Sequence, residues 1–220
     1  MPRAQTDRAA GDTVILLHGL GRTRWSMTVP RLRLASAGYR PVVITYPSRR
    51  LPIEELAAHV DSRIPRLEQG SVHFLTHSLG GIVVRQLLRE RGPRRLGRVV
   101  MLAPPNRGSQ LAEKFLAIPL FGAATGPAGR QLGTSASSAP LRLGPVDFDL
   151  GVIAGNRPAT PLHRLIPEES DGTVAVSETQ VEGMKDFLVV RRGHTFIMND
   201  PQVIDQAIHF FRQGCFATGL

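Results

Sequence analysis

The sequence has one cysteine, few aromatic residues and no long hydrophobic run. Cys215 cannot form an intramolecular disulfide, and no cysteine pair is present for a metal site. No apolar stretch approaches the ~20 residues that a membrane-spanning helix needs. The first apolar run is also shorter than the ~7–15 residues of a signal-peptide core. We therefore expect a cytoplasmic protein without a transmembrane segment or a metal site.

The composition is that of a folded chain. Hydrophobic residues make up 42% of the 220 positions, and the 22 glycines and 17 prolines form no runs. These proportions exclude a disordered or collagen-like protein. The length suits one sizeable domain better than two, so we expect a single domain over residues 1–220.

Positive charge is in excess, with 27 lysines and arginines against 18 acidic residues and a net charge of +9. The densest patches, Arg89 to Arg98 and Arg191–Arg192, have no interleaved aromatic residues and match no nucleic-acid-binding signature. We interpret the excess as a solvated, arginine-rich surface. We expect no nucleic-acid partner, and at most a weak attraction to anionic surfaces.

Short runs rich in valine and isoleucine alternate with helical patterns along the chain. The runs lack an inside/outside alternation, which is typical of parallel strands buried on both faces. Alternating strands and helices predict βαβ units and an open, doubly wound α/β sheet. We expect strands at 13–17, 41–45, 72–76, 99–102, 151–154 and 187–190. Helices are expected to end near 37, to begin near 53, to run from about 78 to before Gly92–Pro93, and to run from 201 to near 214. The apolar stripe of the second helix reaches residue 67, but Pro65 should end or kink it.

One interval, about 104–150, is far longer than an ordinary connection between two strands. Its first half, 110–121, is apolar and partly helical, whereas glycine, alanine, serine and proline dominate 122–144, which we expect to be irregular. Insertions on the ligand side of α/β domains commonly form lids or binding loops, and we expect a lid here. The alternative is a surface excursion that packs only on its own sheet.

The first segment whose residues could carry catalysis is Thr76-His77-Ser78-Leu79-Gly80-Gly81, between a predicted strand and a predicted helix. A serine in such a turn is held out at the carboxyl edge of the sheet, where ligands of open α/β sheets bind. The usual pattern is G-x-S-x-G, and Thr76 replaces its first glycine. This context favours Ser78 as a nucleophile over Ser78 as an ordinary helix cap.

A second segment, His18-Gly19-Leu20-Gly21, follows the first predicted strand. Acyl transfer needs two fixed N–H donors aimed at the developing oxyanion. The backbone N–H groups of Leu20 and Leu79 are the candidates. In the alternative interpretation the two glycines only form a tight turn.

A base and an acid should follow Ser78 in the order Ser, Asp or Glu, His. His194 follows the last predicted strand at the correct edge, whereas His209 lies within an amphipathic helix. Asp171 lies in the connection that leaves the 151–154 strand and can reach the same edge. Glu168 and Glu169 remain alternative partners for the histidine.

Five motifs together resemble the small lipases and esterases of the α/β-hydrolase superfamily. They are 17–21, 76–81, Ala103-Pro104-Pro105-Asn106-Arg107-Gly108-Ser109, Ser170-Asp171-Gly172-Thr173-Val174 and Gly193-His194-Thr195. The resemblance implies a three-layer α/β-hydrolase fold, with Ser78, Asp171 and His194 as the catalytic triad and Leu20 and Leu79 as the oxyanion hole. It implies hydrolysis of a carboxylic ester without a cofactor. Because the chain begins at the strand usually numbered third, we expect a minimal sheet of six parallel strands in the order 2-1-3-4-5-6.

The substrate is expected to be a small-molecule ester with a short to medium acyl chain. Leu20 and five further residues, namely Trp25, Met27, Phe115, Leu116 and Phe121, are candidates for the walls of an acyl pocket, since such sites are mostly apolar. A thioesterase or acyltransferase with the same triad, and a catalytically silent binding module with this fold, are the alternative functions. Met27 could equally be a core contact of the helix ending near Ala37.

Overall fold

A computed structural model describes residues 11–116, 119–158 and 164–218. Its six strands form one all-parallel sheet in the order β2-β1-β3-β4-β5-β6. This confirms the expected fold class and strand order. The strands are β1 (Thr13–Leu17), β2 (Arg40–Ile44), β3 (Val72–His77), β4 (Leu96–Leu102), β5 (Leu150–Gly155) and β6 (Asp186–Val190).

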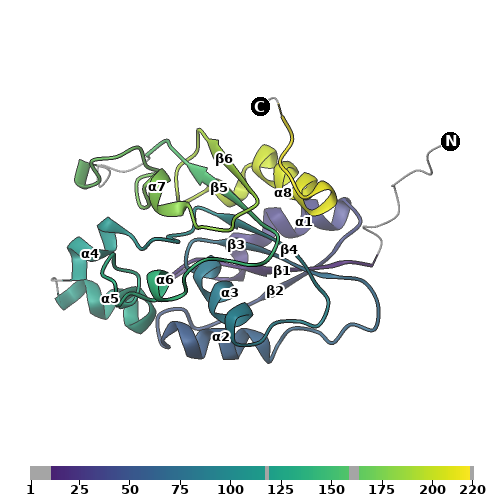
Figure 1. The fold of residues 1–220 in the computed structure, drawn as a ribbon, viewed down its shortest axis with the longest axis horizontal. Helices are drawn as coiled ribbons and strands as arrows, with labels where there is room; N and C mark the ends of the chain where they lie inside the picture. Colours follow the sequence, from purple (N-terminus) through teal and green to yellow (C-terminus); the bar gives the residue numbers. More distant parts are fainter. Residues whose placement is uncertain (1–10, 117–118, 159–163, 219–220) are drawn as a thin grey trace.

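Helices cover both faces of the sheet and give three layers (Figure 1). α1 (Thr28–Ser36) and α8 (Pro201–Gln213) pack on one face, and α2 (Ile53–Asp61) and α3 (Leu79–Glu90) pack on the other. Ile15 and Leu17 of β1 belong to the core beneath α2 and α3, whereas Val14 and Leu16 belong to the opposite core. Burial on both faces explains why these strands read as continuous apolar runs. Within the described ranges, no helix has the length and apolar character required to cross a membrane.

The ends of two helices follow from single residues. α8 begins after Asp200, whose Oδ1 accepts the N–H groups of Gln202 at 2.8 Å and Val203 at 3.2 Å. α2 ends at Asp61, in the turn before the position where the sequence predicts an end or a kink. The reason is Pro65, which has no N–H to donate to the carbonyl of Asp61 and whose ring would clash with it.

The interval after β4 contains more helix than expected. It carries α4 (Gln110–Leu116), α5 (Pro119–Arg130) and α6 (Ala139–Arg142), so the expectation of an irregular second half was wrong. α5 is broken at Gly126, where φ is 70° and an added Cβ would lie 1.8 Å from the carbonyl oxygen of Arg49. The small residues of this segment therefore allow close backbone packing.

A buried arginine connects the insertion to the helix that follows Ser78. Arg85 of α3 is 4% exposed, and its guanidinium donates to the carbonyl oxygens of Asn106 (2.9 Å), Pro140 (3.1 Å) and Gly144 (2.6 Å) and to Asn106 Oδ1 (3.2 Å). All four acceptors are uncharged oxygens. Burial lowers the pKa of Arg85 to about 10, which still leaves it positively charged at neutral pH.

Arg85→Met should therefore destabilise the fold. Removing the guanidinium leaves buried carbonyl oxygens without donors, at a cost of about 1–3 kcal/mol each, and we expect a loss of about 3 kcal/mol in the free energy of unfolding. Urea denaturation measures this loss. Arg89→Met is the matched control, because Arg89 lies on the same helix but is exposed; it should change stability by less than about 0.5 kcal/mol. Equal effects of the two variants would contradict the anchoring role of Arg85.

Candidate active site

Ser78 lies in a strained turn between β3 and α3. Its backbone has φ 53° and ψ −123°, a conformation that residues other than glycine rarely adopt. An added Cβ on Gly80 would lie 2.9 Å from the carbonyl oxygen of Leu17, and one on Gly81 would lie 3.0 Å from Met101 Sδ. Glycine at both positions therefore lets α3 approach β1 and β4, while Ser78 retains 8% exposure.

His194 reaches Ser78 from the loop after β6. Its Nε2 lies 3.1 Å from Ser78 Oγ, and its Nδ1 lies 2.7 Å from Asp171 Oδ2. Because an ionised carboxylate only accepts, Nδ1 carries the proton and Nε2 is free to accept from the serine hydroxyl. The three side chains thus form one hydrogen-bonded row.

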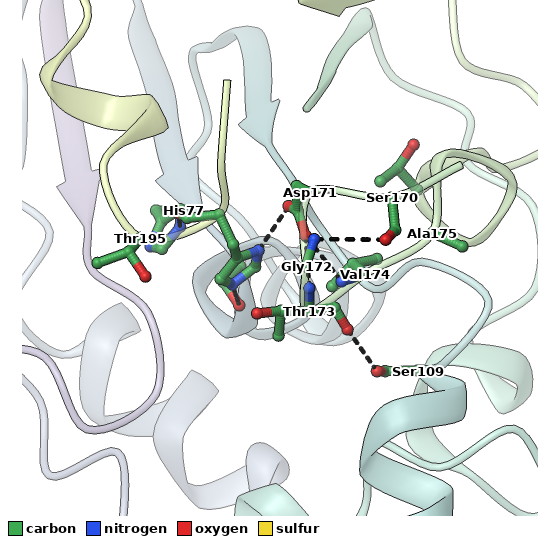
Figure 2. Close-up of polar contacts among 12 residues, drawn as sticks. His77, Ser109, Ser170, Asp171, Gly172, Thr173, Val174, Ala175 and Thr195 are labelled. Carbon is green, nitrogen blue, oxygen red and sulfur yellow. Dashed lines mark hydrogen bonds and ion pairs between the residues drawn. The ribbon is translucent and has the colours of Figure 1, made fainter. Parts of the chain in front are cut away.

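Asp171 is held by its own loop and is 2% exposed. Its Oδ1 accepts the N–H groups of Thr173 at 2.9 Å and Val174 at 2.8 Å, and its carbonyl oxygen accepts the N–H of His194 at 3.1 Å. Figure 2 shows this loop, with the hydroxyl of Ser109 donating to the carbonyl oxygen of Thr173 at 3.1 Å. Asp171 and His194 are therefore connected through both backbone and side chain.

The alternative acids make different contacts. Glu168 accepts hydrogen bonds from Gln110 and Ser177, and Glu169 accepts one from Asn156. Among the described residues, Asp171 is the carboxylate that hydrogen-bonds to the His194 ring.

Both candidate oxyanion donors have a free N–H in the described part of the chain. Leu79 is the first residue of α3, where backbone N–H groups have no partner within the helix. Leu20 lies in a loop that is fixed on both sides: Gly21 N–H donates to Ser48 Oγ at 3.0 Å, and the Tyr46 hydroxyl donates to the carbonyl oxygen of His18. The arrangement suits an anion beside Ser78.

The rings of His18 and Tyr46 pack against each other beside this loop. They stack with centroids 4.3 Å apart and an angle of 3° between their planes. Burial lowers the pKa of His18 and raises the pKa of the Tyr46 hydroxyl, so both rings are uncharged at neutral pH. The candidate oxyanion loop, residues 18–21, therefore packs against two uncharged rings that add no charge to the site.

The candidate acyl-pocket residues have separate locations. Met27 is fully buried in the core beneath α1 and α8, so its side chain has no surface available to a substrate. Trp25 is 77% exposed, with the Arg24 guanidinium 5.8 Å from its ring centroid. Phe115 and Leu116 of α4 are half-buried, and Phe115 packs near the acid loop. The side chain of Phe121 lies outside the described residues.

The insertion contacts both the candidate oxyanion loop and the segment that follows Asp171. An added Cβ on Gly129 of α5 would lie 3.3 Å from Leu20 Cδ2, which places this helix against the oxyanion loop. At its other end, the N–H of Gln110 donates to the carboxylate of Glu178, in α7 (Val176–Thr179), at 2.6 Å. Burial raises the pKa of Glu178 above its ordinary value. The insertion thus contacts segments on two sides of Ser78.

Two cavities differ in their relation to this site. One of about 340 Å³ adjoins His194 and is lined by Arg192, Gly193, Thr195, Phe196, Asn199, Asp200 and Pro201. A larger one of about 1520 Å³ lies at the opposite edge of the sheet, between the ends of α2 and α3. The smaller cavity is lined by the residues on either side of His194, whereas the larger one is remote from Ser78.

Two contacts of the site were not anticipated from the sequence. His77 Nε2 donates to the carbonyl oxygen of His194, in the loop after β6, at 2.9 Å. Arg22 donates to the carbonyl oxygen of Thr195 at 3.1 Å. Both contacts join residues more than 100 positions apart, so no local sequence pattern reveals them.

The sequence matches the model of the alpha/beta hydrolase family over residues 14–187. The chain belongs to this family. No protein of curated function is similar enough in sequence to be matched.

Several solved structures share the alpha/beta hydrolase fold of this chain. A lipase of Bacillus licheniformis in its mature form has a TM-score of 0.70 and 17% identity, and the match covers 90% of this chain and 91% of that one. A metagenomic carboxyl esterase has a TM-score of 0.64 and 20% identity over 84% of this chain and 65% of that one. A lipase-esterase related protein of Clostridium acetobutylicum has a TM-score of 0.56 and 13% identity, and the match covers 92% of this chain and 94% of that one. At these identities the likeness shows the fold alone.

Proposed function

We propose that this alpha/beta hydrolase is a carboxylic ester hydrolase that uses Ser78 as nucleophile, His194 as base and Asp171 as the acid that orients the base. The observation that carries the proposal is the hydrogen-bonded row from Ser78 Oγ through His194 to Asp171 Oδ2. A nucleophile within reach of a base that is itself oriented by a third group is the arrangement required for acyl transfer.

The reaction has two halves. His194 Nε2 takes the hydroxyl proton as Ser78 Oγ attacks the ester carbonyl, and the N–H groups of Leu20 and Leu79 stabilise the oxyanion. Collapse of the tetrahedral intermediate breaks the bond to the alcohol, which receives the proton from His194 and leaves the acyl group on Ser78. Water, deprotonated by His194, then attacks the acyl-enzyme and releases the acid.

Asp171 stabilises the imidazolium that forms in each half of the reaction. It is buried and already holds two backbone N–H groups, so it does not have to reorganise when the charge appears. No cofactor enters this scheme.

The proposed substrates are esters of short to medium acyl chains. The proposed walls are Leu20, Trp25, Phe115, Leu116 and Phe121. The approach of Gly129 in the insertion to Leu20 supports a wall that combines the insertion with the oxyanion loop. Each buried methylene contributes about 0.8 kcal/mol only while apolar wall remains to cover it. An insertion of this length is too small for a full cap, so the wall should end after a few carbons.

A series of p-nitrophenyl esters from acetate to palmitate tests this substrate range. We expect kcat/KM to rise with chain length, reach a plateau and then decline, and matched thioesters to react more slowly. Trp25→Ala should reduce the rise while leaving acetate hydrolysis unchanged. Leu32→Ala, at an exposed position on α1, is the control and should leave the profile intact. A profile that still climbs at palmitate, with activation at an emulsion interface, would replace this assignment with a true lipase.

A further inference from the structure

His77 is the last residue of β3 and precedes Ser78 directly. It is 1% exposed, and its ring centroid lies 4.9 Å from that of His194 with a tilt of 48°. Its hydrogen bond to the carbonyl oxygen of His194 fixes its tautomer: a carbonyl oxygen only accepts, so Nε2 carries the proton and Nδ1 does not. His77 thus contacts both the backbone and the ring of the proposed base.

The opposite edge of the His77 ring faces the oxyanion loop. An added Cβ on Gly19 would lie 2.8 Å from His77 Nδ1 and 3.2 Å from Ser78 Cβ. This close approach leaves no room for a side chain at position 19. The ring of His77 therefore fills the space between the oxyanion loop and the base loop, while its backbone continues into the nucleophile.

The sheet alone does not set the distance between Ser78 and His194. Ser78 follows β3, whereas His194 follows β6, and β4 and β5 lie between these two strands. From the acid side, Asp171 holds His194 through its carboxylate and its carbonyl oxygen. From the serine side, the hydrogen bonds donated by His77 and by Arg22 hold the same loop.

Charge is compatible with this arrangement. Burial holds the pKa of His77 well below its ordinary value. Electrostatic repulsion from His194, Arg22 and His18 lowers this pKa further. His77 therefore stays neutral while His194 becomes positively charged during the reaction. A charged ring at 4.9 Å would oppose that step.

We propose that His77 is a positioning residue, whose Nε2–H bond to the His194 backbone keeps the base at hydrogen-bonding distance from Ser78. This inference rests on the proposed function. A displacement of about 1 Å in a reacting group can cost roughly 10²-fold in rate. Loss of the bond should accordingly lower kcat by roughly 10- to 100-fold and leave KM within about 3-fold, because His77 does not touch the substrate.

His77→Gln and His77→Asn form a matched pair for the test. Both carry the same primary amide, but the glutamine amide nitrogen can occupy the position of Nε2, whereas asparagine is one methylene too short to reach the His194 carbonyl. His73→Asn is the control. His73 lies on the same strand and is 4% exposed, but it is at the opposite edge of the sheet, where its two ring nitrogens are hydrogen-bonded to Arg98 N–H and Asp12.

The measurement is kcat and KM on one p-nitrophenyl ester, with the active fraction of each variant counted by titration with a fluorophosphonate. We expect His77→Asn to lose kcat, His77→Gln to recover most of it, and His73→Asn to retain wild-type kcat per active site. Equal kcat in the glutamine and asparagine variants, whether both fast or both slow, would overturn the positioning role. Absence of ester turnover in the wild-type protein would instead refute the proposed function.

Discussion

Replacing Ser78 by alanine is expected to lower ester hydrolysis by roughly 10⁴- to 10⁶-fold, since no other group in the row can form the acyl-enzyme. The fold should be unaffected, because alanine can occupy the same buried turn. Matched measurements of kcat/KM and of urea denaturation separate the two effects. A variant with wild-type turnover would show that the reaction does not use Ser78.

Ser78→Gly extends this test to the strained backbone. Glycine adopts a φ of 53° without penalty, so this variant should be as inactive as Ser78→Ala but more stable by about 1 kcal/mol. If glycine gave no gain over alanine in the free energy of unfolding, the turn would not store the strain that its dihedral angles indicate.

Asp171→Asn is expected to lower kcat by roughly 10⁴-fold, the effect of the equivalent change in a well-studied serine protease. The asparagine oxygen can still accept the N–H groups of Thr173 and Val174. Its NH₂ group then faces His194 Nδ1 and favours the tautomer that presents Nε2–H to Ser78. That tautomer cannot take the serine proton.

Substitutions of the neighbouring acids are the controls for this prediction. Glu169→Gln removes a carboxylate from the same segment. Because this carboxylate contacts Asn156 rather than His194, kcat should stay within about 2-fold of wild type. A loss in Glu169→Gln that matches the loss in Asp171→Asn would mean that the effect arises from the charge of this segment rather than from the orientation of His194.

The sheet was predictable because its pattern is local. The strands are short apolar runs, fully buried in β1, β3 and β5, and right-handed crossovers then restrict their order. α8 was equally predictable, because Asp200 and Pro201 mark its start and Gly214 marks its end. The end of α2 was predictable as well, because Pro65 interrupts an apolar stripe that continues to residue 67, and the helix stops at Asp61.

The insertion and the surroundings of Ser78 depend on tertiary contacts. The glycines at 126 and 129 indicated a loop, but they permit close packing of α5 against Arg49 and Leu20. The burial of Arg85 required oxygens from residues 21 to 59 positions away in the sequence. Met27 was a candidate for the acyl pocket because it is apolar, but it is buried in the core. Periodicity and motifs do not encode such distant contacts.

Labelling by a fluorophosphonate tests the central claim most directly, because the probe reacts covalently with a serine that is activated by its neighbours. Incubation of the wild-type protein, followed by peptide mass mapping, should give one adduct on Ser78, no adduct in Ser78→Ala, and much slower labelling in Asp171→Asn. An unlabelled wild-type protein that is demonstrably folded, or an adduct on another residue that persists in Ser78→Ala, would contradict the assignment of Ser78, His194 and Asp171 as the reacting groups.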